Sequence, residues 1–231
     1  MNNYIIWNGK DSRDIDGLII SELPPITKPK IRTKITTIDG RDGSFVDYLG
    51  YESYTKNVVI GIKHTKDIDK LIKYFTGKGE VIFSNEPDKY YKAQIFRDVD
   101  YERLLRYKTA TVTFYVQPFK YKVREPKFAL NITNQTSYMV TNQGLEDSKP
   151  IITLYGSGDV TFTLNGTDIF TITIDDDYVT VDSEEQEAYK GGTLKNRKMG
   201  GDFPIFKPGI NTITWSGTLT KIVVEPRSRW L

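Results

Sequence analysis

The sequence predicts a mainly β protein with an α+β domain in its first half and an all-β, jelly-roll-like sandwich in its second half. Three observations predict this fold class. Apolar and polar residues alternate from Ala110 to Val116, as in a half-buried strand. Asn165-Gly166, a strong hairpin signal, separates two alternating stretches of the second half. One stretch, Thr65 to Gly77, has a convincing helical period.

The predicted helix from Thr65 to Gly77 has one apolar face. Its apolar residues recur at positions i, i+3, i+4 and i+7: Ile68, Leu71, Ile72 and Phe75. Thr65 is a suitable N-cap, and Gly77 supplies a left-handed residue that ends a helix. We expect this face to pack against a sheet.

The first half adds short strands and sharp turns. Residues 2–7 followed by Asn8-Gly9 predict an opening hairpin, and Leu18 to Ile20 predict a further strand. Residues 27–38 alternate charged with β-branched side chains, so neither side is apolar enough for a core strand. We interpret this segment as an arm or edge hairpin completed by a partner, with a solvated edge as the alternative. Residues 38–43 contain two Asp/Gly turn signals and predict a constrained loop.

The domain boundaries follow from composition. Residues 1–117 form the predicted N-terminal domain, and residues 118–127, which carry Pro118 and Pro126, form the predicted linker. Residues 128–231 form the predicted C-terminal domain, whose short strands are separated by turns at the spacing of a jelly-roll-like sandwich.

Composition excludes several classes of site. The chain has no cysteine, which excludes disulfides, thiolate metal sites and cysteine nucleophiles and fits a reducing cytoplasm. His64 is the only histidine, so sites with two imidazoles are excluded. The N-terminus lacks a secretory signal, and no apolar run reaches the ~18 residues of a membrane span. We expect a soluble, non-enzymatic protein without metal or cofactor.

Charge and acidic clusters add little chemistry. The net charge is +2, and neither half has the dense basic patch of a nucleic-acid binder. Asp175 to Asp177 are adjacent and fit a hairpin tip better than a calcium site. Asp182 and Glu184 lie in an acidic stretch, where a carboxylate pair for glycoside hydrolysis is the minor alternative to a solvated loop. Trp230, next to the C-terminus, is a candidate for an interface or for clamping the chain end.

Short motifs recur along the chain in a fixed order. The first half has Asp16-Gly17-Leu18, and Gly40-Arg41-Asp42-Gly43 ahead of a Tyr-rich stretch. The second half has Asn142-Gln143-Gly144, Pro150-Ile151-Ile152, Tyr155 to Asp159 with Asn165-Gly166, Gly201 to Pro204, Pro208 to Asn211, and Pro226 to Leu231. In the order and spacing of these motifs, the sequence resembles the distal tail protein (Dit) family of long-tailed bacteriophages and prophages over nearly the whole chain.

The resemblance implies a virion protein of the phage tail tip, synthesised in the host cytoplasm. Its N-terminal domain would form a hexameric ring, and its C-terminal domain would be a galectin-like sandwich. The ring would join the major tail tube protein to the tail-tip protein, and in some relatives to receptor-binding proteins, without a membrane or specific nucleic-acid partner. The second half lacks the histidine of sugar-binding galectins. A carbohydrate-binding module for cell-wall glycans is the alternative function.

The polar arm and the constrained loop supply the candidate interface. We expect ring or partner contacts at six residues: Arg32, Lys34, Asp39, Arg41, Asp42 and Trp230. No catalytic, cofactor-binding or metal-binding residue is expected.

Overall fold

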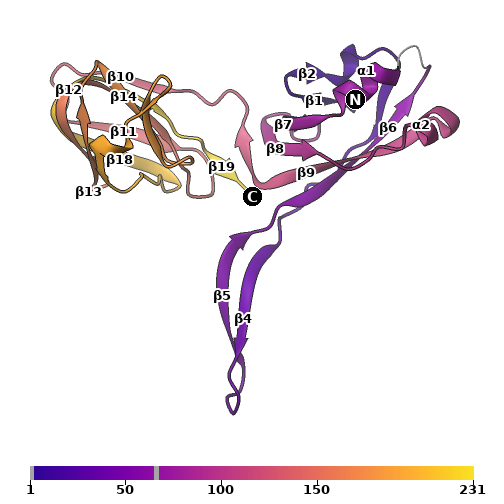
Figure 1. Ribbon diagram of the computed structural model, residues 1–231, viewed down its shortest axis with the longest axis horizontal. Coiled ribbons are helices and arrows are strands. Elements are labelled where there is room, and N and C mark those ends of the chain that lie inside the picture. The colour runs from indigo at the N-terminus through magenta and orange to yellow at the C-terminus, as the bar shows by residue number, and fades with distance from the viewer. Residues whose placement is uncertain (1–2, 65–67) are drawn as a thin grey trace. The chain divides into compact units, whose positions relative to one another are not determined.

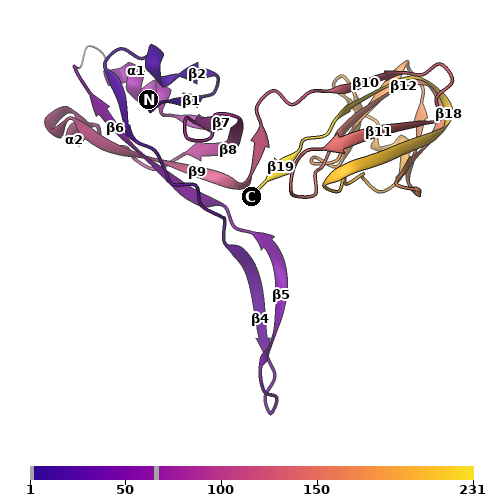
Figure 2. The same ribbon diagram turned by 180° about the vertical axis from the view of Figure 1, so that it is seen from behind.

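The computed structural model describes residues 3–64 and 68–231. They form two compact units, of which the first runs to Val123 and also includes Leu231, and the second runs from Arg124 to Trp230. Strands dominate both units, and the two α-helices of the described chain lie in the first (Figures 1 and 2). The expectation of a mainly β protein is therefore confirmed.

An antiparallel sheet forms the body of the first unit, with strand order β2-β1-β7-β8-β9-β6-β3. The strands are β1 (Ile5–Trp7), β2 (Lys10–Asp11), β3 (Leu18–Glu22), β6 (Tyr54–Ile62), β7 (Gly77–Phe83), β8 (Lys89–Ile95) and β9 (Thr109–Lys122). Val58 pairs with Val112 and Ile60 with Ala110 across β6 and β9, and all four are buried. The alternation seen in the sequence thus produces one apolar face, which carries the core of this unit.

The predicted helix is present in shorter form as α1 (Ile68–Tyr74). Leu71 and Phe75 are buried in the core, as expected, but Ile72 is 40% exposed. The 7 described residues of α1 make about two helical turns, fewer than the predicted length implied. Thr65, the expected N-cap, lies outside the described residues, and Gly77, with φ +94°, begins β7.

A second helix, α2 (Tyr101–Tyr107), was not predicted from the sequence. Asp100 caps its N-terminus, because the Asp100 carboxylate accepts a 2.7 Å hydrogen bond from the backbone N–H of Arg103. Lys108 ends the helix in the left-handed conformation, with φ 60°. Leu104 is its one fully buried residue, so the apolar period is too weak to stand out.

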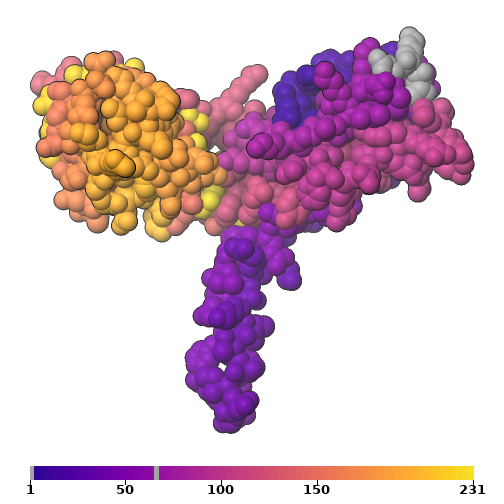
Figure 3. Space-filling view, viewed as in Figure 1, coloured from indigo at the N-terminus to yellow at the C-terminus, as the bar shows by residue number. Residues whose placement is uncertain are grey.

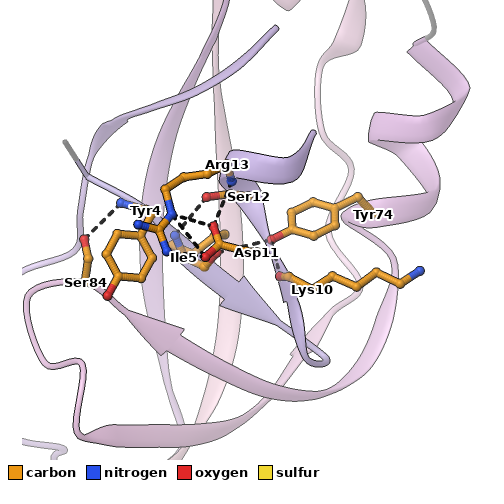
Figure 4. A network of polar contacts seen from close by, with 8 residues as sticks. All are labelled: Tyr4, Ile5, Lys10, Asp11, Ser12, Arg13, Tyr74 and Ser84. Atoms are coloured by element: carbon orange, nitrogen blue, oxygen red, sulfur yellow. Dashed lines mark hydrogen bonds and ion pairs between the residues drawn. The ribbon is translucent and has the colours of Figure 1, made fainter. Parts of the chain in front are cut away.

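Polar contacts fasten the N-terminal hairpin to α1 (Figure 4). The Tyr74 hydroxyl reaches the carbonyl oxygens of Ile5 and Lys10 at 3.5 and 3.1 Å. Asp11 forms an ion pair with Arg13, in the 3₁₀ turn Ser12–Asp14, at 2.5 Å. This edge of the sheet is thereby closed by a short strand and a polar network.

Strand β9 runs further than the sequence indicated. Residues 118–122, expected in the linker, continue the strand, and Tyr90 and Tyr91 of β8 pair with Tyr121 and Lys120. Because Lys120 and Tyr121 are buried, this stretch belongs to the first unit despite its proline and its irregular pattern.

The second unit is built on two long strands, β12 (Ile151–Leu164) and β18 (Gly209–Glu225). The other strands of its sheet are β10 (Phe128–Asn131), β11 (Ser137–Asn142), β13 (Thr167–Ile174), β14 (Tyr178–Asp182), β15 (Glu187–Lys190), β16 (Thr193–Leu194) and β17 (Met199–Gly201), whereas β19 (Arg229–Trp230) lies outside this sheet. The first half of β12 pairs with β14, and its second half pairs with β13. Each half of β12 also pairs with β18, so the two strands take part in both layers.

Glycines allow β12 and β18 to turn from one layer to the other. The register shifts after Tyr155, where a Cβ on Gly156 would lie 2.1 Å from the carbonyl oxygen of Thr218. Gly217 has φ +95°, and its Cβ would lie 2.2 Å from the carbonyl oxygen of Asp159. Only glycine fits such close approaches, so the sheet folds over here. Leu154 and Phe162, from the two layers, share one core, which confirms the β-sandwich.

Candidate interaction surface on the hairpin of strands β4 and β5

A hairpin of unusual exposure projects from the first unit. Strands β4 (Ile31–Thr37) and β5 (Ser44–Tyr51) form a two-stranded sheet of their own. Every residue from 32 to 50 is exposed, and Figure 3 shows the hairpin standing clear of the other strands of its unit. Because an isolated two-stranded hairpin is only marginally stable in water, this one is suited to being completed by a partner.

One face of the hairpin carries no charged side chain. It consists of three cross-strand pairs: Thr33 with Tyr48, Ile35 with Val46, and Thr37 with Ser44. Directly opposed residues of a β-ladder point to the same side, so these six residues form one face, which we call the uncharged face. Ile35 is 65% exposed, Val46 46% and Tyr48 76%. Such exposed side chains, gathered on one face of a narrow arm, make this face a candidate contact surface.

The opposite face is charged. Lys34 pairs with Asp47, and Thr36 pairs with Phe45. The Arg41 guanidinium lies 4.3 Å from the centroid of the Phe45 ring, within the range of a cation–π contact. This face therefore combines both signs of charge with one aromatic ring.

The tip of the hairpin is the constrained loop expected from the sequence. Gly40 and Gly43 have φ values of +80° and +84°, which glycine adopts without strain. The backbone N–H of Arg41 donates to the carbonyl oxygen of Ile38 at 3.2 Å. Asp39 and Asp42 are exposed on either side of this turn.

The structure brings five of the six expected interface residues onto this hairpin. Arg32 donates from Nη2 to the carbonyl oxygen of Leu49 at 2.8 Å, which ties β4 to β5. Trp230 instead belongs to the second unit, where it is half-buried in β19. Sequence reasoning did not select Ile35, Val46 and Tyr48. Their signal becomes visible only when the register places them on one face.

The carboxylates considered for glycoside hydrolysis have structural partners. Asp182 is buried and accepts hydrogen bonds from both terminal nitrogens of Arg227 at 2.6 and 2.8 Å. Burial acts to raise the pKa of Asp182, but the hydrogen bonds from Arg227 and from backbone amides outweigh it and lower the pKa. A general acid needs the opposite shift. Glu184 lies 3.5 Å from the same guanidinium.

The acidic run Asp175 to Asp177 is partnered by lysines. Lys195 contacts Asp175 and Asp176, and Lys190 contacts Asp177 at 3.6 Å. Among the described residues, no group of three or more acidic or imidazole side chains is placed to hold a metal ion. Likewise, no helix in the described parts of the chain is long and apolar enough to cross a membrane.

The second unit has tyrosines on an outer face, but they do not form an open platform. Tyr155 and Tyr178 lie side by side with ring centroids 5.4 Å apart, and both are half-buried. Lys221 lies over the Tyr155 ring, and Lys190 lies over the Tyr178 ring. In the described residues 124–230, the large apolar side chains with high exposure are aliphatic. This surface does not provide the exposed rings that a carbohydrate-binding module would use.

Solved structures show the same fold in phage tail proteins. The chain is similar to SPP1 Dit (gp 19.1), described as a paradigm of the hub adsorption apparatus in phages that infect Gram-positive bacteria. The match covers 100% of both chains, with a TM-score of 0.73 and 17% identity. A chain of the phage p2 baseplate, in its activated conformation with Sr, matches with a TM-score of 0.50 and 10% identity over 97% of each chain. No family model and no curated protein sequence matches. These likenesses confirm the fold that the sequence resemblance implied.

Proposed function

We propose that the chain is a structural hub protein of a phage tail tip, and that its first unit assembles into a hexameric adaptor ring. The exposed uncharged face of the β4–β5 hairpin carries this proposal. The fold supports it, because the similarity to SPP1 Dit, a hub protein of an adsorption apparatus, extends over both complete chains. Its role is geometric and non-enzymatic, since the ring holds other tail components in register.

A ring of identical subunits uses a heterologous contact, in which one surface of each copy meets a different surface of the next. We propose that the uncharged face forms the centre of this contact. Ile35 and Val46 are 65% and 46% exposed, so burying the rest of each side chain contributes less than the roughly 1.5–3 kcal/mol of full burial. The charged residues Arg32, Lys34 and Arg41, with Asp39 and Asp42 at the tip, form its polar rim. Assembly also covers the backbone edges of the hairpin, which otherwise invite unspecific pairing.

The partners of the ring follow from the hub role. We propose that one side binds the major tail tube protein and the other binds the tail-tip protein, with receptor-binding proteins at the periphery. The protein then resides in the virion, and nucleic acid passing through the ring makes no specific contact with it. Trp230, in the second unit, is proposed to contact a partner or to hold the chain end in place.

A carbohydrate-binding role for the second unit has less support. The tyrosines of its outer face are half-buried beneath lysines, and the acidic residues are paired. A glycan contact made by this unit would be an addition to the hub role and would leave the exposed hairpin unexplained.

Electron microscopy of the purified full chain tests the proposal. We expect particles with six-fold symmetry and a central opening, alone or after mixing with the tail tube protein. Particles that stay single under both conditions, together with specific retention on a cell-wall glycan column, would replace the hub by a binding module.

A further inference from the structure

The apolar face of the first sheet ends in a buried polar cluster. Lys56 lies on β6 in line with Val58 and Ile60, on the core side, and is 3% exposed. Lys120 of β9 is also buried. Glu86, in the turn between β7 and β8, forms an ion pair with Lys120 and is the anion near Lys56. Two cations thus share one nearby anion inside the protein.

The contacts in this cluster are unequal. Glu86 accepts from Lys120 at Oε1 and from the Tyr91 hydroxyl at Oε2, the latter at 2.8 Å. Lys56 instead donates from Nζ to the carbonyl oxygen of Pro25 at 2.9 Å. Its Nζ also lies 5.0 Å from the centroid of the Tyr91 ring and 5.5 Å from that of Tyr54. A backbone carbonyl and ring faces are weak compensation for a desolvated ammonium group.

Pro25 belongs to residues 23–30, the segment that leads from β3 into the hairpin. Side chains of the body hold this segment by its carbonyl oxygens. Asn85 donates to Pro24 at 3.0 Å, Lys56 to Pro25, and Tyr54 to Thr27 at 3.4 Å. Residues 23–30 belong to no strand, and besides these side-chain contacts they are held by the buried Pro24 and Pro29 and by Leu23, which packs against the core.

There is also open space where the chain leaves the hairpin, between β5 and β6. A hollow of about 430 Å³ lies beside Tyr51, Glu52 and Ser53, against Tyr115 and Gln117 of β9. Ser53 and Gln117 are within 3.3 Å of each other at its edge. On the side of residues 23–30 the root is held by the buried Pro24 and Pro29, whereas on the side of Tyr51 to Ser53 it borders this hollow.

We propose that residues 23–30 are a hinge of the hairpin, closed when Pro25 covers Lys56 and open when the Lys56 ammonium reaches water. The hinge would let one subunit adjust its hairpin to a neighbour. The inference concerns the single chain and does not depend on the ring.

The charge of Lys56 sets the sign of the pH response. Burial lowers the pKa of Lys56 to about 8, Glu86 acts against this shift, and Lys120 adds to it. Burial also raises the pKa values of Tyr54 and Tyr91, so both stay neutral in this range. In the open form the pKa of Lys56 returns toward its usual 10.5. Raising the pH therefore favours the closed form, by up to roughly 30-fold between pH 6.5 and 9.5.

Spin labels measure the hinge directly. The chain has no cysteine, so Thr36→Cys, on the face of the hairpin opposite the uncharged face, and Thr111→Cys on β9 accept labels only at these sites. Distances within one chain are measured by pulsed electron resonance after dilution with unlabelled protein. We expect two populations of distances at pH 6.5 and one at pH 9.5. A distribution that is the same at both pH values would overturn the hinge.

Substitutions identify the titrating group. Lys56→Met is expected to abolish the pH response, while Lys34→Met, on the exposed hairpin, keeps it. Lys120→Met removes a neighbouring cation and frees Glu86, so the midpoint of the response moves to higher pH. A pH response that persists in Lys56→Met, or a midpoint that does not move in Lys120→Met, contradicts the assignment to Lys56.

Discussion

Ile35 and Val46 lie directly opposite each other on β4 and β5, and both side chains are exposed. Cross-strand apolar pairs of this kind normally cover a core. Here the pair is flanked by Thr33 with Tyr48 and by Thr37 with Ser44, without a charged residue on that face. The arrangement has the composition of an interface centre, from which charge is depleted.

A positive charge on the uncharged face should abolish assembly. In the double variant Ile35→Lys and Val46→Lys, burial of the pair would require two unpaired ammonium groups to lose their water. Because both positions are exposed in the single chain, we expect the free energy of unfolding to stay within about 0.5 kcal/mol of wild type. Thr36→Lys, on the opposite face, is the matched control. Light scattering measures the mass of the assembly. Rings formed by the double variant would exclude this face as the contact.

Charge reversal at the rim should have a smaller effect. Arg32→Glu and Arg41→Glu are expected to weaken the ring while each chain remains folded, with a loss of about 1 kcal/mol or less per exposed contact. Added salt should reduce the difference from wild type, because it screens exposed charges. The control is Lys73→Glu, a charge reversal at an exposed position of α1. Dissociation constants from a dilution series provide the readout, and equal constants for all variants would remove these arginines from the interface.

The buried ion pair of the second unit should matter for stability. In Asp182→Asn, Arg227 loses a carboxylate that holds it at 2.6 and 2.8 Å. We expect the second unit to lose on the order of 3 kcal/mol of its free energy of unfolding. Asp147→Asn, which removes an exposed pair with Lys207, should cost less than about 1 kcal/mol. Urea unfolding at pH 7 compares the two variants.

The same variant gives a test by pH. The folded-state pKa of Asp182 is lowered from 3.8, so the pair stabilises the fold above that value and its contribution is lost as the pH falls through the folded pKa. The stability difference between wild type and Asp182→Asn should be constant from about pH 8 to 5 and should shrink below about pH 4. A difference that grows on acidification would show that Asp182 is not held as an anion.

The point where β18 passes from one layer of the sandwich to the other depends on Gly217. In Gly217→Ala, the new Cβ would lie 2.2 Å from the carbonyl oxygen of Asp159 at a backbone φ of +95°. We expect a loss of several kcal/mol or failure of the second unit to fold, because both backbones would have to move. Gly192→Ala, which has nothing within 4 Å of its Cβ, is the control. Melting curves followed by circular dichroism separate the outcomes, and similar curves would mean that this point tolerates a side chain.

The sequence predicted the elements that have strong local signals. The alternation along β9 and the Asn165-Gly166 turn correspond to a core strand and a hairpin in the structure. Helix α2 was not predicted because Leu104 is its only fully buried residue. The continuation of β9 was not predicted because the burial of Lys120 depends on Glu86, which lies in a turn between two other strands. These are tertiary effects without a local pattern.

The candidate surface on the β4–β5 hairpin could be predicted only in part from the sequence. The alternation of charged and β-branched residues in β4 indicated an unusual strand, and the Asp/Gly signals indicated its tip. The apolar content of the surface depends on Val46 and Tyr48, which belong to β5. Which side of the hairpin they occupy follows from the register, and the shift near Arg32 alters that register.

The mass of the full chain in solution tests the central claim most directly. Light scattering on a sizing column is measured over a concentration series, first with the chain alone and then with excess tail tube protein. The ring predicts six times the 26.5 kDa of one chain, or a complex that contains six copies of it. A mass of one chain at every concentration, and no complex with the tube protein, would contradict the hub role.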